Sequence, residues 1–139
     1  MLTGSFVAIA TPMPTGGALD LPALRKLIDF HAANGTAGIV VVGTTGESPT
    51  VSVDEHCLLI KTAIDHAAGR LPIIAGTGYG TRQAIAYAKE AEKAGAAGLL
   101  VLPHYLVEAD SEGISRHVAA ICRAVKIGVI VYNRGICRL

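Results

Sequence analysis

The feature that most constrains the fold is a regular alternation of short aliphatic runs and helical segments along all 139 residues. Most of these runs are nearly continuous in Val, Ile, Leu or Ala, as is typical of parallel strands that are covered on both faces. The sequence therefore predicts parallel β-strands that alternate with helices. The expected strands cover residues 6–10, 38–42, 71–75, 98–102 and 127–132.

The segments between these runs have helical periodicity and recognisable ends. Asp20 can cap the first helix, with Pro22 in its opening turn. Ser52 and Glu55 form a capping box at the start of the second. Cys122 falls on the apolar face of the last helix, so we expect it to be buried. The third and fourth helices are expected to begin at Thr81 and at Asp110 or Ser111, and glycines end the first three, at Gly35, Gly69 and Gly95.

An internal repeat indicates how these units are arranged. Residues 35–41 and 95–101 share a Gly-x-x-Gly-aliphatic pattern two βα periods apart, which favours an array of equivalent units. Each of the four units is about thirty residues long, close to one-eighth of a (β/α)8 barrel of about 250 residues. The sequence thus predicts an α/β fold, the N-terminal half of a TIM barrel, with residues 1–139 forming one partial domain that ends after a fifth strand. A complete five-stranded doubly wound domain is the alternative.

Composition excludes several classes of partner. Twelve Lys and Arg balance eleven Asp and Glu, which leaves no electrostatic footprint for nucleic acid. The longest aliphatic runs are far too short for a membrane span, and no basic, apolar leader precedes the first strand. Three widely spaced cysteines fit reduced thiols. We expect a cytoplasmic protein that binds neither nucleic acid nor membranes.

In parallel α/β folds, ligands bind beyond the carboxyl ends of the strands. Small residues and hydroxyls dominate those positions here, notably in residues 43–48 and 76–81, and they suit a small anion such as a carboxylate. Tyr105 and Tyr132 each follow a strand at this end, where a phenol can donate, accept or relay a proton. The alternative is that both are rim aromatics.

Other kinds of site are disfavoured. The loop at residues 76–81 has Thr81 where a dinucleotide-binding Gly-x-Gly-x-x-Gly needs its third glycine, and no P-loop occurs. The five histidines form no His-Glu-x-x-His pair and the cysteines lack zinc-finger spacing. We expect no metal and no organic cofactor.

Three motifs, Thr11-Pro12, residues 43–48 (Gly-Thr-Thr-Gly-Glu-Ser) and Tyr132-Asn133, resemble the dihydrodipicolinate synthase / N-acetylneuraminate lyase family, and the similarity runs over the whole chain. The resemblance implies a (β/α)8 barrel that forms a Schiff base between a lysine and pyruvate or another 2-oxo acid. It also implies a lyase that condenses pyruvate with aspartate semialdehyde in lysine biosynthesis. The Schiff base is itself the electron sink, so no cofactor is needed.

The resemblance also implies roles for individual residues. Tyr132 is expected to transfer protons near the imine, and Thr45 to link it to Tyr105. The counterpart of Tyr105 reaches into a neighbouring subunit in family members, so a homo-oligomer, a dimer or tetramer, is expected. The substrate-binding set is Thr44, Thr45, Gly46 and Arg138, in which the last lies one place later than the arginine of the family's pattern.

From about Tyr79 onward the wording is more similar to the 5-dehydro-4-deoxyglucarate dehydratases of the same superfamily. Residues 78–81, 102–106 and 132–134 carry this similarity. A decarboxylating dehydration is therefore the alternative reaction.

The expected nucleophile is absent from this stretch, because the family's Schiff-base lysine lies at the end of the sixth strand. All five lysines here fall in or beside helical patterns, so we expect the 139-residue chain alone to be inactive. A hypothesis of another class is a noncatalytic half barrel that self-associates through open strand edges and exposed apolar surface.

Overall fold

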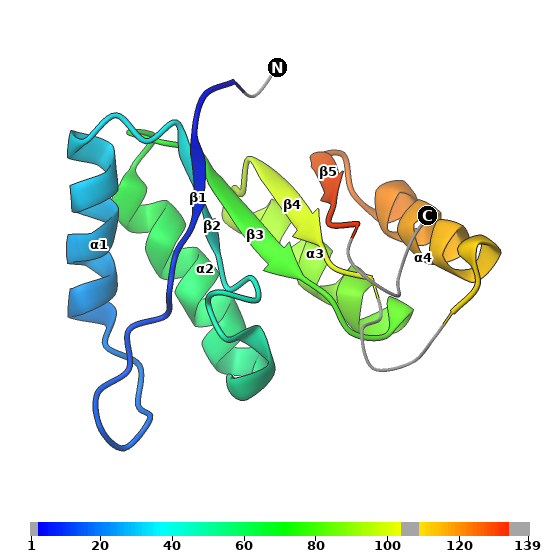
Figure 1. The fold of residues 1–139 in the computed structure, drawn as a ribbon, viewed down its shortest axis with the longest axis horizontal. Coiled ribbons are helices and arrows are strands. Elements are labelled where there is room, and N and C mark those ends of the chain that lie inside the picture. The colour runs from blue at the N-terminus through cyan, green and yellow to red at the C-terminus, as the bar shows by residue number, and fades with distance from the viewer. Residues whose placement is uncertain (1–2, 104–108, 134–139) are drawn as a thin grey trace.

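The structure is a computed structural model and describes residues 3–103 and 109–133. Its strands form one parallel sheet in chain order, and a helix follows each of the first four strands (Figure 1). The strands are β1 Phe6–Ala8, β2 Gly38–Val41, β3 Ile73–Thr77, β4 Gly98–Val101 and β5 Gly128–Val131. The helices are α1 Leu21–Ala33, α2 Val53–Ala67, α3 Thr81–Ala94 and α4 Ser111–Ala124, with a short 3-10 turn, η1, at Ser48–Thr50.

All four predicted helix starts are confirmed, and side-chain hydrogen bonds cap three of them. The Asp20 carboxylate accepts from the Ala23 N–H at 2.9 Å, and the capping box at the start of α2 is complete. Asp110 caps α4.

The third strand lies two residues further along than expected. Pro72 cannot donate to a strand ladder, while Thr77 pairs with a residue of β4. None of the described helices combines the length and the hydropathy that a bilayer-spanning helix requires.

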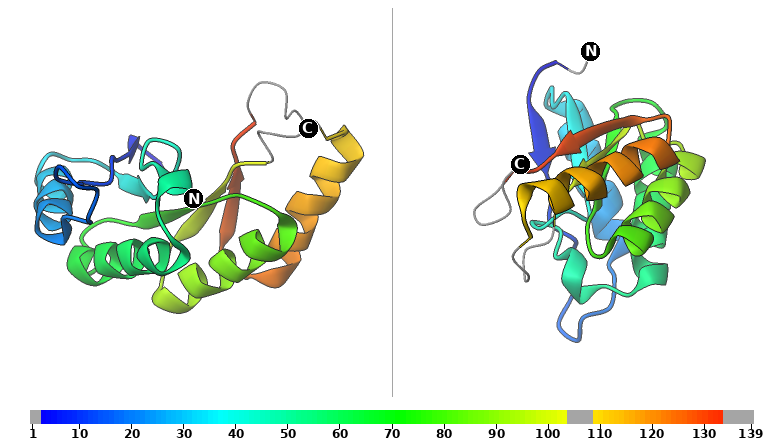
Figure 2. Two further views of the ribbon diagram at one scale, coloured as in Figure 1. Left: turned by 90° about the horizontal axis from the view of Figure 1, so that it is seen from below. Right: turned by 90° about the vertical axis from the view of Figure 1, so that its right-hand side faces the viewer.

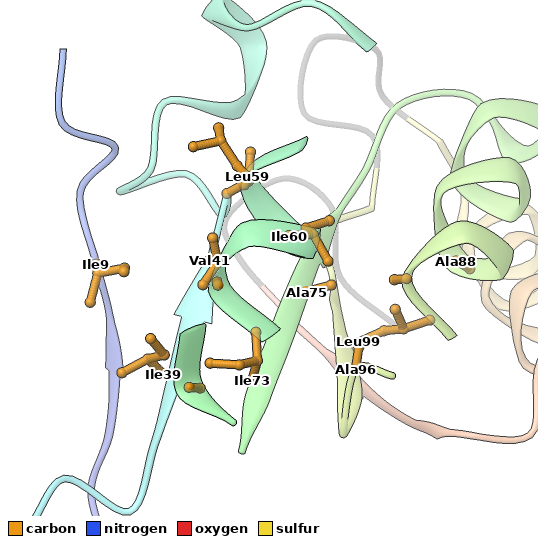
Figure 3. Close-up of a cluster of buried hydrophobic side chains, with 14 of the residues drawn as sticks. Ile9, Ile39, Val41, Leu59, Ile60, Ile73, Ala75, Ala88, Ala96 and Leu99 are labelled. Atoms are coloured by element: carbon orange, nitrogen blue, oxygen red, sulfur yellow. The ribbon is translucent and has the colours of Figure 1, made fainter. Parts of the chain in front are cut away.

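One face of the sheet carries the main core. The four helices lie along the same side of the sheet (Figure 2). Ile39, Ile73 and Leu99, one from each central strand, belong to the same buried cluster as Leu59 and Ile60 of α2 (Figure 3). Burial of these aliphatic side chains supplies the main stabilisation of the layered structure.

The opposite face is buried only at its centre. Val40 and Ile74 pair in one row of that face and are shielded from solvent, whereas Ala8 and Ile130 nearer its margins are exposed. The prediction of strands covered on both faces therefore holds for β2 and β3 and is wrong for β5, whose residues alternate between exposed and half-buried.

The expectation for Cys122 is also wrong, because this side chain is exposed. The buried stripe of α4 runs through Ile114, His117 and Ile121. Cys122 follows Ile121 directly, and one residue turns a helix by about 100°, which takes the thiol out of the interface.

A histidine is buried between α2 and the sheet. The ring of His56 is 1% exposed and stacks on Tyr87 of α3, with centroids 4.2 Å apart. Neither ring nitrogen has a hydrogen-bond partner among the described residues. Burial lowers the pKa of His56 to about 4, an effect that the nearby Gly76 backbone partly offsets. The ring is therefore neutral in the folded chain at neutral pH.

This burial predicts a loss of stability in mild acid. Between the ordinary pKa of 6.5 and about 4, the unfolded chain binds the proton and the folded chain does not. Lowering the pH from 7 to 5 should therefore reduce the free energy of unfolding by about 2 kcal/mol. Urea titration at both pH values measures this loss.

The matched variant is His56→Phe, which keeps the stacking and removes the titrating group. Its free energy of unfolding should change much less between pH 7 and 5. The lowered pKa values of the Asp29 and Glu55 carboxyls act mainly below pH 5, so their contribution in this window is small and is the same in the variant. An equal pH dependence in the His56→Phe variant would contradict the assignment.

Candidate active site at the carboxyl ends of the strands

A cavity of about 300 Å³ lies at the carboxyl ends of the strands. It brings together Thr44, Thr45 and Tyr132, three of the residues that the sequence analysis selected. No charged side chain occurs among the described residues that line it. The others are Ala8, Val42, Gly43, Ser48, Pro49, Thr77, Gly78, Tyr79, Leu100 and Leu102.

The sharp turn of the loop after β2 depends on a close approach between the backbones of Val42 and Gly76. Val42 has a left-handed backbone, with φ of 54°, an uncommon conformation for a β-branched residue. A Cβ atom built on Gly76 of β3 would lie 2.3 Å from the Val42 carbonyl oxygen. Only glycine leaves space for this approach, so β3 sets the path of the loop.

Hydrogen bonds then close the loop upon itself. The Glu47 N–H donates to the Thr44 carbonyl at 3.0 Å, and the Ser48 N–H donates to the Gly43 carbonyl at 3.2 Å. The buried Thr11 hydroxyl, just beyond β1, donates to the Gly46 carbonyl at 2.6 Å. These bonds make the loop a defined platform at the mouth of the sheet.

The platform leaves donors available. Within the described part of the chain, the N–H and hydroxyl groups of Thr44 and Thr45 donate to no protein acceptor. Both side chains are exposed on the cavity. N–H and O–H donors at a concave site whose described lining carries no carboxylate are suited to a small anion.

Tyr132 lies at the end of β5, where its N–H donates to the Val101 carbonyl at 2.8 Å. Its side chain is 43% exposed and lines the cavity, and no hydrogen bond joins it to Thr45 among the described residues. Gly46 belongs to the loop after β2 but is buried and does not line the cavity. Tyr105 and Arg138 lie outside the described residues.

Tyr79, Thr77 and Ser48 also line the cavity, and their sequence patterns did not predict this for them individually. The signal in the sequence is their position at or just beyond the carboxyl ends of β2 and β3, within residues 43–48 and 76–81. Which side chains of such loops turn inward depends on left-handed backbone at Val42 and Tyr79, which no local pattern of these residue types predicts. The described residues contain no group of three or more His, Cys, Asp or Glu placed to hold a metal ion.

A parallel sheet in chain order, with helices on one face and a hydroxyl-lined cavity at the strand ends, defines the class of the protein as a β/α-barrel type. The chain belongs to the Dihydrodipicolinate synthetase family, whose sequence profile matches residues 1–136. This confirms the family resemblance and the predicted α/β fold.

Solved structures agree with this assignment. The dihydrodipicolinate synthase from Acinetobacter baumannii, solved in complex with pyruvate, superposes with a TM-score of 0.93 at 43% identity, over 96% of this chain and 46% of that one. The enzyme from Aquifex aeolicus gives a TM-score of 0.90 at 43% identity, over 94% of this chain and 45% of that one. These neighbours are TIM barrels, of which this chain covers about half.

Among curated relatives, the 4-hydroxy-tetrahydrodipicolinate synthase of Azoarcus sp. (strain BH72) is 56% identical over 134 residues, which are 96% of this chain and 46% of the relative. A probable 5-dehydro-4-deoxyglucarate dehydratase of Azotobacter vinelandii (strain DJ / ATCC BAA-1303) is 50% identical over 129 residues, 93% of this chain and 43% of the relative. The chain thus spans about half the length of the curated relatives it matches.

The close approach at Gly76 predicts an intolerant position. A Gly76→Ala substitution forces backbone apart, so we expect the free energy of unfolding to fall by about 3 kcal/mol. Gly128→Ala in β5 is the matched control, because nothing lies within 4 Å of its Cβ position. The control should change stability by about 0.5 kcal/mol or less. Urea unfolding of both variants measures the difference, and equal stabilities would show that the loop does not depend on this contact.

Proposed function

We propose that this chain contributes the 2-oxo-acid-binding half of the active site of a lyase that condenses pyruvate with aspartate semialdehyde, a step of lysine and diaminopimelate biosynthesis. The observation that carries the proposal is the pair of threonines whose donors are unpartnered within the described residues, in the same cavity as Tyr132. The name of the Azoarcus relative and the pyruvate in the Acinetobacter neighbour support it.

In this proposal the carboxylate of pyruvate lies over the loop after β2. It accepts from the N–H and hydroxyl groups of Thr44 and Thr45, which are charge-assisted hydrogen bonds of the stronger kind. Gly46 supports this position from behind, since its absent side chain lets the loop approach Val42 and Thr11. Arg138 completes the set by binding a carboxylate of the second substrate.

Tyr132 carries the proton that moves during imine formation and during protonation of the carbanion. A phenol that is hydrogen-bonded in a chain of hydroxyls is polarised by its neighbours and becomes an efficient relay. We assign the links of that series of hydroxyls to Thr45 and to Tyr105 of a partner subunit, so the active enzyme is a homo-oligomer. We place this enzyme in the cytoplasm.

The chemistry requires an amine. A lysine Nζ attacks the ketone carbon of pyruvate, the carbonyl oxygen leaves as water, and the resulting imine accepts the electron pair when a methyl proton is removed. The enamine carbon then bonds to the aldehyde carbon. All five lysines of this chain are exposed on helices or just after α4, and none lines the cavity. The 139-residue chain alone therefore binds the 2-oxo acid without capturing it.

A second reaction is favoured by the 50% identity to the Azotobacter relative, and it is the dehydration and decarboxylation of 5-dehydro-4-deoxyglucarate. The same carboxylate platform serves both reactions. A chimera that joins this chain to the carboxyl-terminal half of the Azoarcus relative distinguishes them. Only the first reaction consumes pyruvate with aspartate semialdehyde, and only the second releases carbon dioxide from the sugar acid.

The proposal predicts reversible pyruvate binding at the threonine pair. In an NMR titration of the 139-residue chain, the Thr44 and Thr45 amide signals should shift with pyruvate. Thr45→Val should weaken the affinity about tenfold, because it removes a hydrogen bond to a charged group. Thr36→Val, at the opposite end of β2, is the control and should leave the affinity unchanged.

Borohydride completes this test. Reduction in the presence of pyruvate should leave the mass of the chain unchanged, since no lysine reaches the cavity. Pyruvate shifts that are absent from the loop after β2, or an affinity that is unchanged in the Thr45 variant, would overturn the binding assignment. A stoichiometric reduced adduct would overturn the assignment of the amine to another part of the barrel.

A function of another class, self-association of a noncatalytic half barrel, is favoured by the exposed β5 strand. Ile130 is 43% exposed on the face that no described helix covers. Sedimentation velocity at micromolar concentration should therefore detect dimers or larger species, and Ile130→Lys should shift them toward monomer. Phe30→Lys on α1 replaces an apolar residue that is even more exposed, and serves as the control. A wild-type chain that remains monomeric would exclude this function.

A further inference from the structure

Tyr79 bridges the two loops that form the cavity. It lies in the loop after β3, and its hydroxyl donates to the Ser48 carbonyl at 2.6 Å, across 31 positions of sequence. The ring also lines the cavity beside Thr44 and Thr45. This residue therefore contacts both the wall of the site and the segment that carries the carboxylate-binding donors.

The backbone of Tyr79 adopts a strained conformation. Tyr79 has φ of 72°, a left-handed conformation that is uncommon for a bulky residue. Of the four non-glycine residues with positive φ in the described chain, Val42, Glu47 and Tyr79 all belong to the two loops around the cavity. Such strain persists where surrounding contacts over-determine it, and it concentrates at functional sites.

Contacts within α2 and α3 hold the ring in place. The Tyr79 ring packs on Tyr87 at a tilt of 60°, with centroids 5.9 Å apart. Tyr87 in turn stacks on buried His56 and accepts a hydrogen bond from the Gln83 amide at 3.0 Å. The phenol of Tyr79 thus projects from a buried aromatic row toward the loop after β2.

The loop is consequently held on both sides of Glu47. The Thr11 hydroxyl binds the Gly46 carbonyl before it, and the Tyr79 hydroxyl binds the Ser48 carbonyl after it. We propose that Tyr79 is a positioning residue, whose hydrogen bond to Ser48 fixes the orientation of the Thr44–Thr45 donors toward the carboxylate. The part of this proposal that concerns the ligand depends on the proposed function, whereas the part that concerns the loop does not.

Removal of the phenolic oxygen alone distinguishes a positioning role of Tyr79 from a packing role of its ring. Tyr79→Phe keeps the ring and its contact with Tyr87 and removes the hydroxyl that donates to Ser48. Tyr87→Phe is the matched control, because it also removes one phenolic oxygen from the same aromatic row but none from the loop. Tyr79→Asn is a second variant, since asparagine tolerates the left-handed backbone and has no reach to Ser48.

The first readout is amide hydrogen exchange of the 139-residue chain without ligand. In Tyr79→Phe and in Tyr79→Asn, the Glu47 and Ser48 amides should exchange about fivefold faster, the effect of one lost hydrogen bond. In Tyr87→Phe, and at the β2 amides of every variant, the rates should stay unchanged. Unchanged loop exchange in Tyr79→Phe would overturn the proposal, as would acceleration in Tyr79→Asn alone, which would show that the ring and not the hydroxyl matters.

The second readout is the pyruvate titration of the same variants. Tyr79→Phe should bind pyruvate about fivefold more weakly than wild type, while Tyr87→Phe matches wild type. Faster loop exchange with unchanged pyruvate affinity would overturn the positioning role. A wild-type chain that binds no pyruvate would contradict the proposed function instead, and the exchange measurement would still decide whether Tyr79 fixes the loop.

Discussion

The structure depends on parallel pairing of its strands in chain order. Because each crossover between neighbouring parallel strands has the same hand, successive helices return on the same face of the sheet. Every strand then points its carboxyl end toward one edge, and the loops that follow the strands meet there. The helix-covered face contains the main core, so the chemistry is confined to the loops at that edge.

The site is built more from backbone than from charged side chains. Gly76 admits the Val42 carbonyl, and that approach sets the path of the loop after β2, whose Thr44 and Thr45 line the cavity. Hydroxyls from Thr11 and Tyr79 then fix two carbonyls of the loop. A platform of this kind can bind a carboxylate through preorganised N–H and O–H groups, which need little reorganisation when the ligand arrives.

The roles that we propose for this chain and for the rest of the barrel follow from the positions of the lysines. They are exposed on helices or just after α4, whereas the donors of the Thr44–Thr45 pair lie at the strand ends. In the proposed function, this chain binds the carboxylate and supplies the phenol, and the amine comes from elsewhere in the barrel. The similarity to relatives with two different names fits this arrangement, because a carboxylate platform is common to both reactions while the second substrate is not.

Much of the fold was predictable because its signals are local. Each of these signals acts within a few residues: the Asp20 cap, the Ser52–Glu55 capping box and the aliphatic runs. The type and order of the strands and α-helices therefore follow from sequence. Since the strands are parallel, so does the meeting of Thr44, Thr45 and Tyr132 at one edge of the sheet. Long-range contacts decided the rest. The shift of β3, the exposure of β5 and the bridge from Tyr79 to Ser48 depend on what lies opposite each residue in space. Left-handed backbone at Val42 and Tyr79 is unfavourable on local grounds, so only the contacts of the assembled sheet and loops could select it.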